Sequence, residues 1–316
     1  MLVSPRILFN HCYGQYGIAA INVFTLEQVL GVFRAASNAN APFIIQTTPV
    51  ARDYATPELL IGMIHTAATL YPDTVFAIHL DHGVEAHIGH ALESGHYTSV
   101  MIDASHDPLQ TNIDRTRRVV QQAHEKGIWV EAELGVLSGV EDGLSVEAEM
   151  ARYTQPAEAA FFVKETQCDS LAIAIGTSHG AYKFSGGKGL QFDALKKIQT
   201  VLPGYPLVLH GASAVDPLEV DRVVKAGGQM EKDAKGVSDD EVRRAIQLGI
   251  CKINIATDLR VLWARVHREF FRDYPNQFDP IAPGKVYINE LEKLCTRKFE
   301  AYGAVGKAAE LIHAIH

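Results

Sequence analysis

The amino-acid sequence predicts an α/β fold, a (β/α)8 TIM barrel with additional C-terminal helices. Eight short apolar segments recur along the chain, and they show little of the alternation expected of half-exposed strands. Such segments are typical of parallel strands that are buried on both faces. Amphipathic stretches separate them at intervals of roughly 25–45 residues, which suits eight βα units in a chain of 316 residues. An open doubly wound sheet is the alternative, but no GxGxxG motif follows the first strand.

The order of the elements follows from the same patterns. Helices are expected at 26–40, 57–71 and 112–127, and the last of these stretches ends in Lys-Gly, a usual helix stop. The region after about residue 258 predicts helices that complete the barrel and extend beyond it. The strands are expected at 17–23 (GIAAINV), 43–47 (FIIQT), 75–80 (VFAIHL), 98–103 (TSVMID), 128–134 (IWVEAEL), 170–175 (SLAIAI), 206–210 (PLVLH) and 250–255 (ICKINI).

Composition limits the class of protein. Hydrophobic residues make up 47% of the chain and charged residues 21%, which excludes intrinsic disorder and suits a single barrel domain over residues 1–316. A net charge of −8 argues against nucleic acid or an anionic membrane as a partner. No segment reaches the ~20 apolar residues of a membrane helix. The N-terminus does not resemble a signal peptide, so we expect a cytoplasmic protein.

Cysteine and histidine usage points to the kind of metal site that the chain could build. The four cysteines, at positions 12, 168, 251 and 295, form no cluster, which indicates neither a disulfide framework nor a thiolate metal site. The chain has 14 histidines, so imidazole is the natural ligand for any transition metal.

Polar side chains gather where the predicted strands end, and in this fold the carboxyl ends of the strands form the active site. Three of these ends carry a histidine, namely His82, His179 and His210. No local motif such as HExxH is present, so only the barrel would bring them together. Three imidazoles with an open fourth position are the pattern of a catalytic zinc site. The other polar residues at strand ends include Asn22, Gln46, Thr47, His79, Asp103, Glu131, Glu133 and Asn254.

Several neighbouring features have two interpretations each. Asp81 directly precedes His82, where its carboxylate could move a proton or orient a ligand. Glu133 could orient a ligand or bind a second ion. The glycine-bearing stretches 180–188 and 211–213 suit a phosphate, and the polar tract 138–143 is either a lid with a catalytic acid or an ordinary loop. Five further histidines are expected to be surface or structural residues: His65, His87, His90, His96 and His124.

Six motifs occur in order along the chain: AIHLDHG (77–83), SVMIDASH (99–106), VEAELG (130–135), GTSHGAYK (176–183), LVLHGAS (207–213) and CKINIATDLR (251–260). Through them the chain resembles the class II, metal-dependent ketose-bisphosphate aldolases, from Tyr16 to about Leu311. The set is specific, although no single motif is. The resemblance implies the same barrel and one catalytic Zn²⁺, bound by His82, His179 and His210.

The resemblance also implies roles for other residues. Asp81 would be the acid/base that moves the proton at the aldol carbon, Asn254 would help to hold the enediolate, and Glu141 would be the glutamate of a mobile loop. Thr257 and Arg260 would lie near the distal phosphate, and Lys285 would reach that of a neighbouring subunit. The phosphate of the ketone half, with a monovalent cation nearby, would be bound by Gly180, Lys183, Gly211 and Ser213.

The implied activity is that of a lyase of glycolysis and gluconeogenesis. It is the reversible cleavage of fructose 1,6-bisphosphate to dihydroxyacetone phosphate and glyceraldehyde 3-phosphate through a zinc-stabilised enediolate. One position departs from the pattern, because fructose-bisphosphate members have Asn-x-Asp-Thr-Asp where this chain has Ala256 as the third residue. Alanine there resembles tagatose-bisphosphate members, whereas the following Asp-Leu-Arg and the longer stretch 214–248 favour fructose 1,6-bisphosphate. Tagatose 1,6-bisphosphate is therefore the alternative substrate.

Three other functions are compatible with parts of the pattern. Lys252 has the strand parity of Asn254, so it could be the inward lysine of a Schiff-base aldolase or part of a salt bridge inside the barrel. A zinc hydrolase would use three histidines equally well, but it does not explain the provision for two phosphates. A non-catalytic binding protein gives no reason for ligands at strand ends. The long C-terminal helices and the role implied for Lys285 predict a homodimer or larger homo-oligomer.

Overall fold

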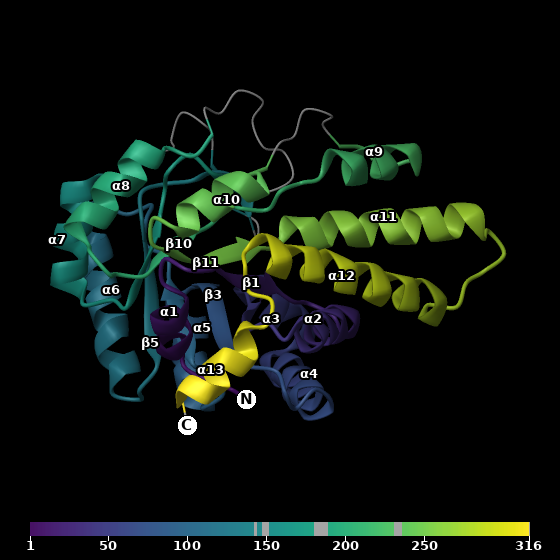
Figure 1. Ribbon diagram of the computed structural model, residues 1–316, viewed down its shortest axis with the longest axis horizontal. Coiled ribbons are helices and arrows are strands. Elements are labelled where there is room, and N and C mark those ends of the chain that lie inside the picture. Colours follow the sequence, from purple (N-terminus) through teal and green to yellow (C-terminus); the bar gives the residue numbers. More distant parts are fainter. Residues whose placement is uncertain (142–143, 147–151, 180–188, 231–235, 316) are drawn as a thin grey trace.

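The computed structural model of the protein describes residues 1–141, 144–146, 152–179, 189–230 and 236–315. Eight parallel strands close into a barrel in the order β1-β11-β10-β8-β5-β4-β3-β2, with helices around it (Figure 1). The predicted (β/α)8 TIM barrel is therefore confirmed, and the eight predicted segments are its strands. They are β1 (Ile18–Asn22), β2 (Phe43–Thr47), β3 (Phe76–Gly83), β4 (Ser99–Ile102), β5 (Trp129–Leu134), β8 (Ser170–Ile173), β10 (Leu207–Leu209) and β11 (Ile250–Ile255).

The barrel strands are buried on both faces, as their unbroken apolar sequences predict. Every residue of β1, β2 and β11 is buried, because the barrel interior covers one face and the helices cover the other. Neighbouring strands run in parallel register, so that Asn22 lies beside Gln46 and Gln46 beside His79. Their carboxyl ends therefore meet at one mouth of the barrel.

The helices begin and end at local signals in the sequence. Thr25 and Gln28 form a capping box at the start of α2, and Asn40 ends that helix in the left-handed conformation. Helix α6 ends at His124, and Gly127 just beyond it has a φ of +69°. The helices are α1 (Pro5–Cys12), α2 (Leu26–Ala39), α3 (Pro49–Ala55), α4 (Pro57–Leu70), α5 (Glu85–Ser94), α6 (Leu109–His124), α7 (Pro156–Thr166), α8 (Phe192–Val201), α9 (Pro217–Lys225), α10 (Asp239–Ile246), α11 (Thr257–Asp273), α12 (Ile281–Ala301) and α13 (Lys307–Ile315).

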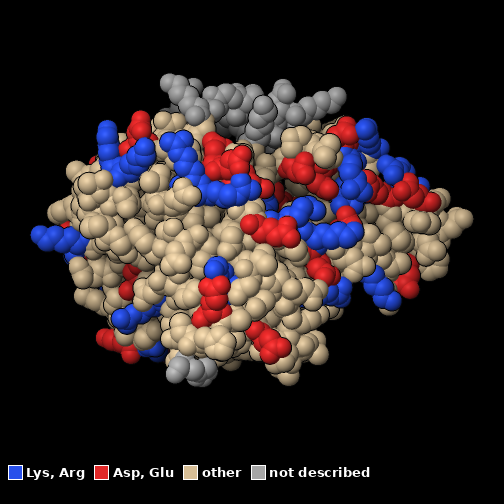
Figure 2. Space-filling view, viewed as in Figure 1, with Lys and Arg blue, Asp and Glu red and all other residues tan. Residues whose placement is uncertain are grey.

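The C-terminal helices extend beyond the barrel, as predicted. Helices α11 and α12 run side by side away from the strands and are joined at their far end (Figure 1). Helix α12 also packs along α2, which ties this pair to the helix layer. In Figure 2 lysine and arginine alternate with aspartate and glutamate over the visible face. The described helices include none with the length and apolar composition needed to cross a membrane.

The polar tract 138–143, which composition describes as a lid or a loop, contains a strand instead. β6 (Ser138–Glu141) pairs antiparallel with β7 (Leu144–Val146) and parallel with β9 (Ser178–His179). Its glycine-rich composition disfavours a strand, but pairing on both sides satisfies the backbone and overrides that local preference. This small sheet follows barrel strands β5 and β8 in the chain, so it belongs to the loops beyond their carboxyl ends.

Candidate metal and catalytic site

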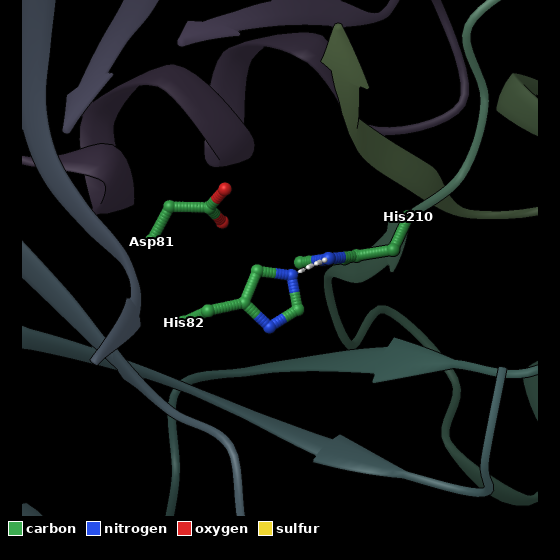
Figure 3. A group of neighbouring side chains, drawn as sticks. All are labelled: Asp81, His82 and His210. Atoms are coloured by element: carbon green, nitrogen blue, oxygen red, sulfur yellow. Dashed lines mark hydrogen bonds between the residues drawn. The ribbon is translucent and has the colours of Figure 1, made fainter. Parts of the chain in front are cut away.

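Two consecutive residues near the end of β3, Asp81 and His82, both face the mouth of the barrel, toward His210 after β10 (Figure 3). Successive residues of a regular strand point to opposite faces. Here the register with β4 shifts between Leu80 and Gly83, and His82 has a φ of +46°. This irregularity turns the backbone so that both side chains reach the same space. A left-handed non-glycine residue costs on the order of 1–3 kcal/mol and is often found at functional sites.

His82 and His210 form a close pair of imidazoles. His82 Nε2 lies 3.0 Å from His210 Nδ1, and the two ring planes are at 90° (Figure 3). The outer nitrogen of each ring contacts a carboxylate, since His82 Nδ1 is 3.1 Å from Asp103 Oδ2 and His210 Nε2 is 2.9 Å from Glu131 Oε1. An ionised carboxylate only accepts hydrogen bonds, so each outer nitrogen carries the N–H. The inner nitrogens therefore direct lone pairs at each other.

A positive charge between two facing nitrogens at this distance, either a proton or a metal ion, stabilises them, and Asn254 Nδ2 also lies 3.2 Å from His210 Nδ1. A transition-metal ion fits this arrangement, because neutral imidazoles fixed by carboxylates on their far side are the usual ligands of such ions. The Asp81 carboxylate lies in the same group, with one ligand atom from each of the three residues within 4.8 Å of the others. Asp81 and His210 are buried and His82 is nearly so. The facing nitrogens and the neighbouring carboxylate therefore fit a metal ion.

The charges around the pair explain how its two rings differ. Burial acts to lower the pKa of His82, but the carboxylates of Asp81 and Asp103 outweigh it and raise that pKa to about 10. Burial lowers the pKa of His210, and its hydrogen bond to Glu131 opposes this only in part. Without a metal, the proton between the rings therefore resides on His82. A metal ion must displace that proton to bind.

Asp81 is fully buried and is held by two amides. Asn22 Nδ2 donates to Asp81 Oδ2 and Asn254 Nδ2 donates to Oδ1, each at 3.0 Å. Gln46 in turn donates to the side-chain oxygen of Asn22. Burial acts to raise the pKa of Asp81, but the positive charges of His82 and Lys252 hold it well below its usual range. The carboxylate is therefore ionised and fixed in orientation beside the imidazole pair.

A buried ion pair lies beneath the imidazoles. Lys252 Nζ donates to Oε1 and Oε2 of Glu131, at 3.0 and 2.9 Å, and lies 3.9 Å from Asp81. Burial acts to raise the pKa of Glu131, but Lys252 and His210 lower it to about 2. The predicted inward orientation of Lys252 is confirmed, and the side chain is engaged in a salt bridge. Glu131 thus links the lysine below the site to His210 within it.

Glu133 is not the hydrogen-bond partner of the outer nitrogen of His82 or of His210. Asp103 and Glu131 take that position on His82 and His210, although Glu133 shares a group with His82 and Asp103 that could hold an ion. Burial, and secondly the charge of Asp103, raises the pKa of Glu133 well above its usual value. Its Oε2 atom has no hydrogen-bond partner within the part of the chain that the structure describes.

The predicted phosphate side lies after β10 and at the start of α11. Gly211 has a φ of +61°, and a Cβ there would meet Ser178 O at 2.6 Å, so β9 lies against the loop that follows His210. Ser213 Oγ accepts a hydrogen bond from Ala256 N at 3.4 Å, which joins this loop to the end of β11. Thr257, the first residue of α11, is buried beside it.

The other predicted residues fall in three groups. The Arg260 guanidinium lies over the Phe24 ring, 5.0 Å from its centroid, just beyond the end of β1. Lys285 is exposed on α12. For Glu141 and His179 the structure describes the backbone, in β6 and β9, and not the side chain. Gly180 and Lys183 lie outside the described residues.

Five residues at the site have structural roles that the sequence did not assign or, for Lys252, gave only as one of two alternatives. Most are polar residues at or near strand ends, which is the only sequence signal that they carry. Their hydrogen bonds orient Asp81, His82 and His210, and those bonds depend on pairings between different strands. These residues are Asn22, Gln46, Asp103, Glu131 and Lys252.

Known proteins resemble this chain in both sequence and structure. The family model described as fructose-bisphosphate aldolase class-II matches residues 4–307. A fructose-bisphosphate aldolase of Helicobacter pylori is 41% identical over 84% of this chain and 85% of its own length, and one of Giardia intestinalis is 38% identical over 94% and 91%. The crystal structure of the YdjI aldolase from Escherichia coli K12 superposes with a TM-score of 0.78 and 31% identity, covering 98% of this chain and all of the other. The chain is therefore a member of the class II fructose-bisphosphate aldolase family, a family of lyases.

Proposed function

We propose that this enzyme reversibly cleaves fructose 1,6-bisphosphate to dihydroxyacetone phosphate and glyceraldehyde 3-phosphate, with Zn²⁺ as its metal. The observation that carries the proposal is the buried imidazole pair beside Asp81, in which carboxylates fix both rings to present lone pairs to one point. The names of the relatives support the substrate, since those from Helicobacter pylori, Giardia intestinalis and Thermus caldophilus are all fructose-bisphosphate aldolases.

The proposed zinc ligands are His82 Nε2, His210 Nδ1 and His179. The contact of Gly211 with Ser178 supports the third ligand, because it holds the strand of His179 against the residue that follows His210. When bound, Zn²⁺ supplies the positive charge that polarises the substrate ketone and favours the enediolate. Glu133 is proposed as a ligand of a second ion, with less support than the three histidines have.

Asp81 is the proposed acid/base. In the cleavage direction a base must take the proton from the hydroxyl at the carbon beyond the breaking bond, and in the synthetic direction an acid must return it. The ionised Asp81 carboxylate is in the accepting form, and the amides of Asn22 and Asn254 hold both of its oxygens in place. Asn254 Oδ1 is buried without a partner among the described residues, which suits a substrate hydroxyl. We assign Glu141 to a second proton transfer from the loop side.

The loops around the mouth of the barrel offer one position for each of the two substrate phosphates. Gly211 and Ser213, together with Gly180 and Lys183, would bind the phosphate of the ketone half, with a monovalent cation nearby. Thr257 at the N-terminus of α11 and Arg260 in its first turns would bind the distal phosphate, which is favoured by the helix N-terminus. Arg260 stacks on Phe24, and this contact supports a position for its charge at the mouth.

The oligomeric state is proposed to be a homodimer or larger. The pair formed by α11 and α12 exposes aromatic side chains near its free end, including Phe278, which is 91% exposed, and Tyr274. Lys285 lies exposed on the same pair and would reach the distal phosphate of a neighbouring subunit.

A product assay tests the proposed reaction. Purified enzyme given fructose 1,6-bisphosphate should release two triose phosphates and no inorganic phosphate, and a chelator should abolish the reaction until Zn²⁺ is restored. Release of inorganic phosphate without triose phosphate would indicate a zinc hydrolase and contradict the proposal. Activity that survives the chelator and is lost on borohydride reduction would indicate a Schiff base on Lys252.

A substrate panel tests the sugar. Wild type should prefer fructose over tagatose 1,6-bisphosphate, and Ala256→Asp should change the ratio of kcat/KM values by about tenfold, the size of one substrate hydrogen bond. Ala256 is 7% exposed beside Ser213, so a carboxylate there would face the substrate. A wild-type preference for tagatose 1,6-bisphosphate would replace the proposed substrate by the alternative.

A further inference from the structure

A second close pair of imidazoles lies outside the barrel, on residues that take no part in the site described above. His65 Nε2 on α4 lies 3.2 Å from His96 Nδ1, which follows α5. Both rings line a cavity of about 370 Å³ between these helices, together with His90 and Glu58. No role in the proposed reaction explains why a histidine of α4 and one that follows α5 converge here.

The spacing of the two nitrogens matches that of two ligands on one ion. Imidazole nitrogens bind Zn²⁺ at about 2.0–2.1 Å, and two such ligands at a tetrahedral angle are about 3.3 Å apart. Burial, and secondly the charge of His96, lowers the pKa of His65, which favours its neutral, ligating form. Because His65 is half-buried and His96 is exposed, an ion can reach the pair from solvent.

His90 takes a supporting position. Arg52 can only donate, and its Nη2 lies 2.8 Å from His90 Nδ1, so a neutral His90 carries its N–H on Nε2. That atom faces Glu58 Oε1 at 3.7 Å. His90 is thereby unsuited to bind a metal through Nε2. Glu58 also lines the cavity, and its negative charge favours a cation there.

We propose that this cavity binds a divalent transition-metal ion of the Zn²⁺ type, with His65 Nε2 and His96 Nδ1 as its protein ligands. Glu58 supplies negative charge in the same cavity, and water completes the coordination. Two ligands hold an ion less tightly than the barrel site, so this site fills at a higher concentration of free zinc. The ion would bridge α4 to the segment after α5, and it would stabilise the folded chain by mass action.

Metal counting on the zinc-loaded enzyme tests the proposal. The free Zn²⁺ concentration is set by a chelating buffer, and bound ions per chain are measured by native mass spectrometry for wild type, His65→Gln/His96→Gln and His124→Gln. His124 is the matched control, an imidazole on the outer helix α6 that contacts Asp169 and lies outside the cavity. Wild type and the control should each bind one ion more than the double variant, whether or not the barrel site holds zinc.

The affinity for that extra ion should fall by at least about tenfold in each single variant, and less in Glu58→Gln. Aldolase activity and the far-UV spectrum of the variants, measured at low free zinc, confirm that they fold. A second test uses the wild-type protein only. Zinc should protect His65 and His96, but not His124, from acylation by diethylpyrocarbonate. An unchanged ion count in the double variant, or no protection of the two histidines, would overturn the proposal.

Discussion

Two pairs of histidines in this molecule have nearly the same spacing and very different surroundings. The facing nitrogens are 3.0 Å apart in His82 and His210 at the barrel mouth and 3.2 Å apart in His65 and His96 on the helix layer. At the mouth, carboxylates hold the outer nitrogen of each ring. On the helix layer, no carboxylate of a described residue contacts the outer nitrogens of His65 and His96.

This difference decides what each pair does without a metal. In the outer pair, His65 and His96, one ring donates its N–H to the other, so an ordinary hydrogen bond satisfies both facing nitrogens. At the mouth, Asp103 and Glu131 hold the outer N–H of each ring, so the inner nitrogens share an added positive charge, a proton without metal and the metal ion when it is bound. The hydrogen-bond partners of the outer nitrogens therefore indicate a tight metal site better than the distance between the two ligands does.

The largest expected difference is chemical, because only the buried pair has a fixed carboxylate beside it. Asp81→Ala should lower turnover by about 10²–10⁴-fold, the usual contribution of a general acid or base, while zinc stays bound to the histidines. Turnover and bound zinc are measured on the same preparation. Asp81→Asn, which keeps the shape, should lose as much. Full activity of either variant after zinc is restored would show that Asp81 only helps to hold the metal.

The next difference is in metal affinity, and it follows from the outer partners. Glu131→Gln removes the charge that fixes His210, and loss of such a partner typically weakens metal binding about 10–100-fold. Zinc affinity is measured by competition with a chelator. Glu133→Gln, two residues along the same strand, is the control and should change the affinity less, because Glu133 contacts neither outer nitrogen.

Glu131 has a second partner, so folding and metal binding must be separated. Its removal leaves Lys252 buried without its carboxylate, which costs on the order of 3–5 kcal/mol of unfolding free energy. Glu131→Gln/Lys252→Met should recover most of that stability and keep the weak zinc binding. Recovery of both properties together would mean that Glu131 acts on zinc only through the stability of the barrel.

The barrel was predictable from the sequence because its strands are buried on both faces. Segments such as 43–47 and 250–255 are mostly apolar, and their few polar residues are buried in the barrel. Their pattern alone therefore identifies them as strands. The positions of His82 and His210 followed from the fold, since parallel strands bring their carboxyl ends together. The tract 138–143 was not predictable, because its strand depends on pairing with residues outside it.

The partners of the site residues could not be predicted, for a geometric reason. Glu131 and Glu133 have the same parity on one strand, and only the positions of His210 and Lys252 on other strands decide which of the two contacts them. The sequence predicts surface or structural roles for His65 and His96, because they are distant in the sequence and belong to no motif. Their contact depends on how α4 packs beside α5, which no local pattern in either segment records.

The last expected difference between the two pairs is their response to pH, and its sign follows from the pKa of the free ligands. At the mouth, zinc must displace a proton from His82, whose pKa is raised to about 10, so affinity should rise roughly tenfold per pH unit from pH 6 to pH 8. On the helix layer the pKa of His65 is lowered from its ordinary value of about 6.5, so affinity should level off above about pH 7. Zinc dissociation constants at each pH, in chelator buffers corrected for their own protonation, separate the two sites. A plateau above pH 7 at the barrel mouth would mean that the carboxylates of Asp81 and Asp103 do not hold a proton on His82. The contrast between the two pairs would then rest only on the hydrogen bonds that Asp103 and Glu131 make to the outer nitrogens.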